Sequence, residues 1–247
     1  MHRDVADRGV ALVIGGGGGI GSAVTRALSE DGYEVVVTYS ANRERAEGLV
    51  GELVGSGRPA ALRALDATDS AQLDGAVREL AGGGRLTCLV HCVGRWTFTH
   101  LTELTDEEID EILRLNLVST LYALRAAGRH VADGGSVVTV SSAATDLAPK
   151  RQASYVAAKA GVEAASRVAA KELGARGVRV NVVRPGATDT GLLRSTTSPR
   201  AIEAMSTANV LRRLGTPGDV GEVVSFLCSD KARFVTGSVL DVAGGLR

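Results

Sequence analysis

The pair of residues most informative about chemistry is a tyrosine followed four positions later by a lysine, Tyr155 and Lys159. In a helix, this spacing places both side chains on one face, one turn apart. An ammonium group beside a phenol favours the phenolate and lowers the phenol pKa from its ordinary value of about 10. Because the chain has only 4 tyrosines among 247 residues, such a pairing is rare by chance. Tyr155 is therefore predicted to act as a general acid or base.

A glycine-rich segment near the start of the chain is predicted to bind phosphate. The glycines 15–19 follow the apolar run Ala11–Ile14 and precede an apolar helical pattern that begins at Ile20. Glycines between a strand and a helix let backbone amides and the helix N-terminus approach a pyrophosphate. The Gly-Lys-Ser/Thr sequence of phosphate loops in nucleoside triphosphatases is absent. The predicted contacts are Gly15, Gly17, Gly18, Gly19, Ile20 and Gly21.

The end of the second predicted strand favours NADPH as the cofactor. A ribose 2′-hydroxyl is normally bound by an acidic residue at this position, and the segment Tyr39–Arg43 has none. Tyr39, Ser40, Asn42 and Arg43 are instead predicted to contact the cofactor, with the guanidinium supplying charge for a 2′-phosphate. The alternatives are an Arg43 that is only solvated and an NAD-dependent alcohol dehydrogenase.

These residues must be positioned by alternating strands and helices. Apolar runs without polar alternation predict strands covered on both faces, and the regular alternation predicts a doubly wound Rossmann domain with a seven-stranded parallel sheet. The predicted strands are Val10–Ile14, Glu34–Tyr39, Ala60–Leu65, Leu86–Val93, Ser136–Val140, Val178–Val183 and Ser238–Val242. The predicted helices are Ile20–Glu30, Arg43–Val54, Ser70–Leu80, Glu107–Val131, Ser154–Leu173, Ala201–Ala208 and Val220–Ser229.

The chain is expected to form one domain over residues 1–247, because it shows no linker and no repeat. Its longest irregular stretch is Gly186–Arg200. Loops of this length in a compact domain commonly bind ligands or cover a site, so a substrate lid is predicted over about 187–213.

Composition excludes several classes of protein. Acidic and basic residues balance at 28 each, which gives no electrostatic reason to bind nucleic acid or an anionic membrane. No apolar run reaches the roughly 20 residues that span a bilayer, and the N-terminal segment lacks the apolar stretch of a signal peptide. Cys88, Cys92 and Cys228 are predicted to be reduced thiols in a cytoplasmic protein. No metal site is predicted, because Cys88, His91 and Cys92 lack a second pair of ligands.

The ordered set of motifs resembles the short-chain dehydrogenase/reductase family over nearly the whole chain. The resemblance is greatest to its 3-oxoacyl-carrier-protein reductases and polyketide ketoreductases. Tyr155 and Lys159 match the catalytic pair of that family, and the glycine segment matches its cofactor loop. By resemblance, the cofactor also contacts Asp66 and Ala67 at the adenine, Cys92 and Gly94 after the fourth strand, and Pro185, Gly186, Thr188 and Thr190 at the nicotinamide carboxamide.

The resemblance implies an NADP(H)-dependent ketone reductase. Hydride would pass from the nicotinamide to a carbonyl carbon while Tyr155 protonates the developing alkoxide. Ser142 would donate a hydrogen bond to that oxygen, Lys159 would hold ribose hydroxyls, and Asn116 would support a water relay. Asn116, Ser142, Tyr155 and Lys159 are thus the predicted catalytic residues. A non-catalytic dinucleotide sensor is the alternative of a different class, although such proteins can lack the tyrosine or the lysine.

Two positions depart from the family pattern. Ile14 stands where a threonine is usual, and His91 begins the segment that is usually Asn-Asn-Ala-Gly. Both segments flank the same part of the cofactor pocket in the family. The lost hydroxyl and the lost amide are therefore expected to compensate each other without leaving an unpaired partner.

The substrate is predicted to be a small apolar, acyl or polyketide-like ketone. By resemblance, basic residues near the fifth strand and fifth helix bind the carrier protein, and Arg176 fits such a place. A carrier protein is nevertheless disfavoured, because Asp133 supplies an acid where a base would be expected. The predicted pocket wall is Trp96, Phe98, Leu147, Leu192 and Leu193, with Ile202 and Met205 in the lid. A homodimer or homotetramer is expected by resemblance, since the helix from Ser154 carries a row of small residues, Ala157, Ala158, Ala160, Gly161, Ala164 and Ala165.

Overall fold

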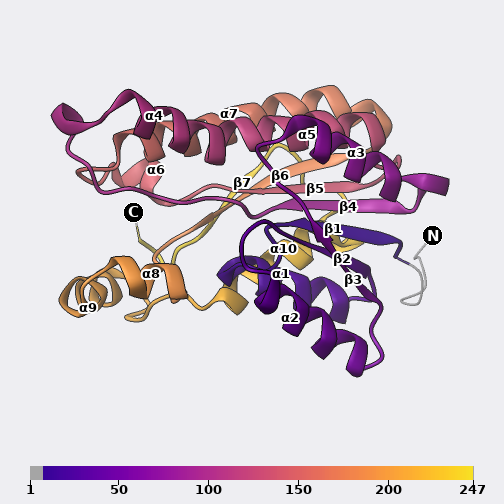
Figure 1. The fold of residues 1–247 in the computed structure, drawn as a ribbon, viewed down its shortest axis with the longest axis horizontal. Coiled ribbons are helices and arrows are strands. Elements are labelled where there is room, and N and C mark those ends of the chain that lie inside the picture. The colour runs from indigo at the N-terminus through magenta and orange to yellow at the C-terminus, as the bar shows by residue number, and fades with distance from the viewer. Residues whose placement is uncertain (1–7, 247) are drawn as a thin grey trace.

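A computed structural model of the protein describes residues 8–246; residues 1–7 and 247, and the predictions made for them, lie outside the described part. Seven parallel strands form one sheet in the order β3-β2-β1-β4-β5-β6-β7, as predicted (Figure 1). The strands are β1 Val10–Ile14, β2 Glu34–Tyr39, β3 Ala60–Ala64, β4 Leu86–His91, β5 Ser136–Val140, β6 Arg179–Pro185 and β7 Val239–Val242.

Helices cover both faces of this sheet. Figure 1 shows α3, α4, α5 and α7 above the sheet and α1, α2 and α10 below it. These helices are α1 Gly19–Glu30, α2 Arg43–Gly55, α3 Ser70–Leu80, α4 Asp106–Leu113, α5 Ser119–His130, α7 Ala153–Leu173 and α10 Pro217–Cys228. Three further helices are α6 Ala144–Leu147, α8 Gly191–Thr196 and α9 Pro199–Ala208.

Strand β1 is apolar throughout because it contributes to two hydrophobic cores. Alternate side chains of a strand point to opposite faces of the sheet. In β1, Leu12 and Ile14 pack into the core beneath α3, α5 and α7. Ala11 and Val13 pack into the core beneath α1, α2 and α10. A strand buried on both faces therefore reads as a continuous apolar run, as the sequence indicated.

Besides shifts of one to three residues at several element ends and the unpredicted short helix α6, the structure differs from the predicted elements at two places. The helix predicted over Glu107–Val131 is interrupted by a π-helical turn at Arg114–Val118, which separates α4 from α5. The irregular stretch predicted over Gly186–Arg200 contains α8. This helix is capped by the Thr190 side chain, which accepts a hydrogen bond from the amide of Leu193 at 3.2 Å. The helix was missed because six residues are too few to show an apolar period.

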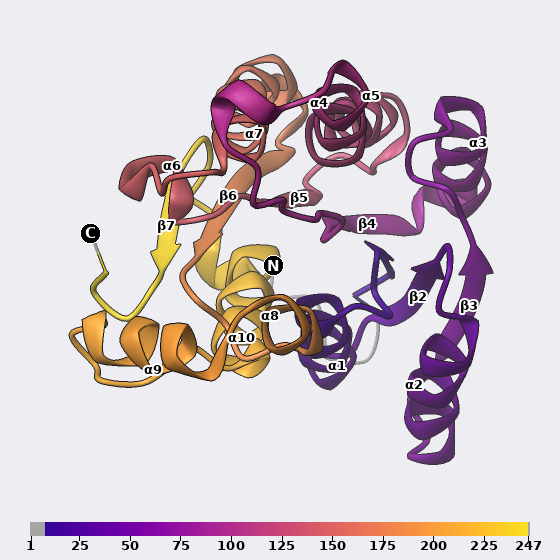
Figure 2. The same cartoon turned by 60° about the vertical axis from the view of Figure 1, so that its left-hand side comes forward.

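The topology brings the predicted site residues to one edge of the sheet. The chain leaves β1 toward β2 and β3 and then returns to add β4 on the other side of β1. A crevice forms outside the carboxyl ends of the strands at such a switch point. The segments after β1, β4, β5 and β6 meet there. In Figure 1, α8 and α9 lie to the left of α1, α2 and α10, and in the turned view of Figure 2 α9 lies beside α10 while α8 overlaps α10 and α1.

Candidate active site

Ser142, Tyr155 and Lys159 open onto one cavity of about 500 Å³. Ser142 follows the end of β5, while Tyr155 and Lys159 lie in the first two turns of α7. Both α7 side chains are buried, and the Lys159 ammonium lies 5.9 Å from the centroid of the Tyr155 ring. The same cavity is lined by glycines 18, 19 and 21 of the loop after β1. The structure thus places the predicted catalytic groups beside the predicted phosphate loop.

The pKa of Tyr155 is raised above its ordinary value. Burial of the phenol is the main cause, and a hydrogen bond from Ser142 opposes it. The expectation that this pKa is lowered is wrong for this structure, because loss of hydration on burial is the largest influence on the phenol. The Lys159 ammonium instead donates a hydrogen bond to the carbonyl oxygen of Val140 at 2.9 Å. Tyr155 is consequently a neutral phenol that carries a proton at neutral pH.

The pKa of Lys159 is lowered, in contrast to that of Tyr155. Burial lowers the pKa of its ammonium from 10.5 to about 8, because the charged form loses hydration, and the nearby Cys92 partly offsets this effect. The side chain is only 3% exposed. A buried amine with its pKa near the physiological range is typical of a functional site.

Asn116 lies in the π-helical turn and supports the segment that follows β4. Its Nδ2 donates to the carbonyl oxygens of Arg95 at 2.9 Å and Ile112 at 3.0 Å, and its Oδ1 accepts from the amide of Arg95 at 3.2 Å. The Thr120 hydroxyl donates to the Asn116 carbonyl at 2.8 Å. These contacts fix the wall of the cavity beside Lys159. The predicted water relay stays a prediction.

The glycine loop is packed too closely for side chains at two of its positions. A Cβ at Gly21 would lie 2.2 Å from the carbonyl oxygen of Gly15, and one at Gly19 would lie 2.7 Å from Thr190. Gly15 itself has a φ of 77°, which favours glycine. Its amide donates to the Thr38 hydroxyl at 3.0 Å. This cradle at the N-terminus of the 12-residue helix α1 suits a pyrophosphate group.

The two departures from the family pattern occupy the core side by side. Ile14 and His91 are register partners in β1 and β4 and are both buried. The His91 ring pairs with the hydroxyls of Ser119 at 3.1 Å and Thr120 at 3.3 Å. Burial lowers the pKa of His91 to about 3, with a smaller contribution from the charge of Lys159. His91 is therefore neutral and has partners of its own, as the expected compensation requires.

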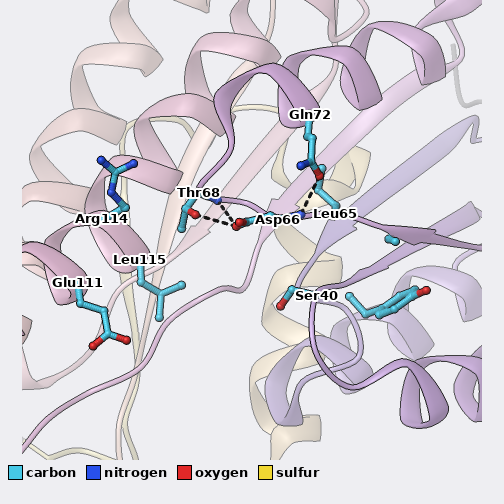
Figure 3. Close-up of a pocket in the computed structure, with 10 residues that line it drawn as sticks. Ser40, Leu65, Asp66, Thr68, Gln72, Glu111, Arg114 and Leu115 are labelled. Atoms are coloured by element: carbon cyan, nitrogen blue, oxygen red, sulfur yellow. Dashed lines mark hydrogen bonds between the residues drawn. The ribbon is translucent and has the colours of Figure 1, made fainter.

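The adenine end of the predicted cofactor site is a second cavity, of about 590 Å³, lined by Tyr39, Ser40 and Asp66. One carboxylate oxygen of Asp66 accepts from both the amide and the hydroxyl of Thr68, each at 2.8 Å (Figure 3). The Asp66 amide donates to Gln72 Oε1 at 3.3 Å. Thr68 and Gln72 were not predicted, although an Asp-x-Thr turn after a strand is a recognisable signal. Ala67, which lies between Asp66 and Thr68 in the sequence, is buried and does not line this cavity.

Residues predicted to bind the 2′-phosphate lie at the start of α2, and two of them already have partners. The Asn42 side chain caps this helix by accepting from the Arg45 amide at 3.3 Å. The Arg43 guanidinium forms an exposed ion pair with Glu47 at 2.7 Å. Arg45, which was not predicted, lines the catalytic cavity together with the glycine loop. The i to i+4 spacing of Arg43 and Glu47 would have indicated their pairing.

The predicted substrate wall comes together in the catalytic cavity. The rings of Trp96 and Tyr155 meet edge to face with centroids 6.5 Å apart. Ile202, predicted in the lid, lies on α9 and lines a different hollow together with Asp189 and Arg213. Leu246, which was not predicted, also lines the cavity. The predicted residues that line it are Cys92, Gly94, Trp96, Phe98, Leu147, Pro185, Gly186, Thr188, Thr190, Leu192, Leu193 and Met205.

Residues 8–246 show no metal-binding cluster and no membrane-spanning helix. In this part of the chain, no group of histidine, cysteine or acidic side chains is arranged to hold a metal ion. Its helices include none with the length and apolar character needed to cross a membrane. Cys88, Cys92 and Cys228 are free thiols.

The fold and the site define a dinucleotide-binding oxidoreductase, and comparison with known proteins gives its family. A family model described as enoyl-(acyl carrier protein) reductase matches residues 15–247. The chain belongs to the short-chain dehydrogenase/reductase family and is an oxidoreductase of the type that includes 3-oxoacyl-carrier-protein and polyketide reductases. The predicted family, fold class and enzyme class are confirmed.

Relatives and solved structures cover nearly the whole chain. An uncharacterized oxidoreductase of Methylorubrum extorquens is 37% identical, with 96% of this chain and 97% of the relative covered. A versicolorin reductase of Emericella nidulans is 33% identical (97% and 96% covered). A 3-oxoacyl-[acyl-carrier-protein] reductase of Staphylococcus aureus is 32% identical (96% and 97% covered).

Two crystal structures illustrate the shared fold. A dehydrogenase/reductase from Sinorhizobium meliloti has a TM-score of 0.91 at 33% identity, with 98% of this chain and 96% of that chain covered. A short chain dehydrogenase from Burkholderia cenocepacia, solved in complex with NADP, has a TM-score of 0.91 at 31% identity, with 98% and 99% covered.

Proposed function

We propose that the protein is an NADPH-dependent ketone reductase in which Tyr155 donates the proton. The observation that carries this proposal is the convergence of Ser142, Tyr155 and Lys159 on one cavity that also contains the glycine loop. A bound nicotinamide would supply hydride to the carbonyl carbon of the substrate. The elevated pKa of Tyr155 keeps the phenol protonated and able to protonate the carbonyl oxygen as negative charge develops there.

The other residues of the chain would orient and stabilise the reacting oxygen. The Ser142 hydroxyl borders the same cavity and would donate a hydrogen bond to that oxygen. Lys159 would hold the ribose hydroxyls of the cofactor. Asn116 would support the wall of the cavity indirectly, because its side chain makes two hydrogen bonds to the backbone of Arg95.

NADP(H) is the cofactor that the site supports best. The glycine cradle accommodates a pyrophosphate, and the segment after β2 carries Ser40 and Arg43 and no acidic residue before α2. Arg45 adds a second guanidinium near the loop. The NADP-bound relative and the family both support this cofactor. The Arg43 guanidinium forms an ion pair with Glu47. To contact a phosphate, it would have to break this ion pair or bind the phosphate and Glu47 at the same time.

An uncharged apolar or aromatic ketone fits the cavity better than a ketone delivered by a carrier protein. Trp96, Leu192 and Leu193 make one wall. The Arg176 guanidinium, predicted as a potential carrier contact, is bonded to Asp133 at 2.8 Å and to the carbonyl oxygens of two further residues. The nitrogen atoms of Arg176 therefore donate hydrogen bonds within the subunit, which does not favour a contact with a carrier protein. A relative named versicolorin reductase is compatible with this preference.

A homodimer or homotetramer in the cytoplasm is part of the proposal. Small side chains at Ala157, Ala160 and Ala164 are exposed along α7, and Val168 on the same helix is 54% exposed. Leu121 on the neighbouring α5 is also exposed. Such a surface permits close packing of helices between subunits. Light scattering that detects only the 25.4 kDa species would contradict assembly.

The test follows NADPH absorbance with a panel of aromatic ketones, cyclic ketones and acyl thioesters. We expect turnover of an apolar ketone, and near-complete loss of turnover with unchanged NADPH affinity in Tyr155→Phe. Tyr122→Phe, which removes a hydroxyl outside the cavity, is the matched control. Full activity of Tyr155→Phe would refute the proton donor. Tighter binding of NADH than of NADPH would favour an alcohol dehydrogenase, and binding without any turnover would favour a sensor.

A further inference from the structure

A buried carboxylate lies directly behind the predicted catalytic serine. Glu163 is on α7, one turn beyond Lys159, and its side chain is 8% exposed. Its Oε1 accepts hydrogen bonds from the hydroxyls of Ser141 at 2.8 Å and Thr145 at 3.0 Å. These two residues flank Ser142 in the sequence. Glu163 itself is not among the residues that line the catalytic cavity.

An arginine joins this carboxylate to the last two strands. Arg184 stands immediately before Pro185 on β6, and its side chain is 14% exposed. Its guanidinium forms a two-pronged ion pair with Asp146, at 2.8 and 2.7 Å, and a further ion pair with Asp241 on β7. It also lies 4.0 Å from Glu163 and donates to the Thr145 hydroxyl at 3.4 Å.

The cluster fixes the short segment that carries Ser142. The Thr145 hydroxyl makes contacts with both Glu163 and the carbonyl oxygen of Ser142, the latter at 2.9 Å. Asp146, in the next position, is held by Arg184. Helix α6 has only four residues, Ala144–Leu147. So short a helix is not stable on its own, and its position must come from tertiary contacts such as these.

We propose that Glu163 and Arg184 are positioning residues that hold Ser142 and α6 at the cavity through Ser141, Thr145 and Asp146. This proposal rests on the proposed reductase function for its effect on rate. Its structural part, the anchoring of residues 142–148, stands independently of that function. Neither residue contacts the cavity, so both act through the groups that they hold.

The charged and polar groups around Glu163 and Arg184 explain why a carboxylate and a guanidinium suit these two positions. The Glu163 carboxylate accepts from two hydroxyls and has two guanidinium groups nearby, since Arg167 lies 3.4 Å from its second oxygen. Hydrogen bonds to a charged group are stronger than those between neutral groups. A planar guanidinium can bond Asp146 with two nitrogens and still reach Asp241, whereas an ammonium cannot reproduce this geometry.

The same cluster bears on substrate selection. Leu147, the last residue of α6, lines the cavity, and Ala144 packs in a small apolar cluster with Tyr155 and Trp96. A shift of α6 would therefore move part of the substrate wall and change the surroundings of the only tryptophan. Trp96 fluorescence thus reports on the position of α6 without any need for turnover.

The test uses Glu163→Gln, which keeps the shape of the side chain and removes its charge, with Glu172→Gln as control because Glu172 is exposed on the same helix. Hydrogen exchange of residues 142–148 is expected to accelerate at least about 10-fold in Glu163→Gln. The Trp96 emission should shift, and both readings should stay unchanged in the control. Unchanged exchange at 142–148 would overturn the proposal, whether or not the wild-type protein reduces ketones.

The kinetic part compares Glu163→Gln, Ser142→Ala and the double variant. If Glu163 acts through Ser142, Glu163→Gln lowers kcat roughly 10- to 100-fold with little change in NADPH affinity, and it has no further effect once Ser142 is alanine. Equal losses in both backgrounds would mean that Glu163 does not act through the serine. Should Glu163→Gln fail to fold, Thr145→Val cuts the same link while leaving the ion pairs, and the same outcomes apply. Absence of turnover in the wild type would refute the proposed function alone, since the exchange measurement still decides the anchoring.

Discussion

Replacing Lys159 by methionine should make the folded protein more stable while abolishing its activity. The ammonium is fully buried, and its pKa falls from 10.5 to about 8 because it loses hydration on folding. Each pKa unit corresponds to about 1.4 kcal/mol, so the charged lysine costs the folded state about 3 kcal/mol at neutral pH. Methionine has a similar length and no charge. It forfeits the hydrogen bond to Val140, worth about 1 kcal/mol, which leaves an expected net gain of about 2 kcal/mol.

The pH dependence distinguishes this cause from better packing. Lys159 has a lower pKa in the folded protein than in the unfolded chain, so the unfolded chain binds more protons between pH 8 and pH 10.5. Wild-type stability therefore rises with pH through that window, and the penalty is complete only below it. The advantage of Lys159→Met should be greatest at pH 7 and should decline steadily above pH 8.

Urea unfolding of both proteins from pH 6.5 to pH 9.5, monitored by circular dichroism, measures this difference. Lys171→Met is the matched control, because Lys171 is exposed on the same helix and its loss should leave the pH profile unchanged. A gain in Lys159→Met that is equal at every pH would refute desolvation as its cause. A loss of stability at pH 7 would refute the reasoning altogether.

Three further changes test separate parts of the site. Gly21→Ala forces a Cβ to within 2.2 Å of the Gly15 carbonyl oxygen, so NADPH affinity should fall at least about 10-fold in a fluorescence titration; unchanged affinity would contradict the close packing of the loop. Asn116→Ala removes the bonds to Arg95 and should lower the free energy of unfolding by about 2 kcal/mol in urea, an effect that a solvated side chain would not give. Arg43→Ala should reduce the kcat/KM preference for NADPH over NADH about 10-fold, and an unchanged ratio would shift that role to other residues.

Local sequence patterns determined much of the fold and the identity of the reacting groups. The bounds of β1, β2 and β5 were predicted to the residue, because buried parallel strands are continuous apolar runs. The spacing of Tyr155 and Lys159 sufficed to place them on one helical face, since helical geometry depends only on neighbours along the chain. The glycine loop was recognisable because it stands between such a strand and a helix.

Tertiary structure alone decided how these groups are charged and held. The pKa of Tyr155 is raised by burial of the phenol in the folded protein, which the spacing of Tyr155 and Lys159 could not indicate. Glu163 and Arg184 are 21 positions apart in the sequence, and no local period links them to Ser142. The π-helical turn around Asn116 likewise arises where a helix packs against the segment after β4. A sequence encodes its periodic elements through near neighbours, whereas desolvation and ion-pair geometry are sums over atoms that only the folded chain brings together.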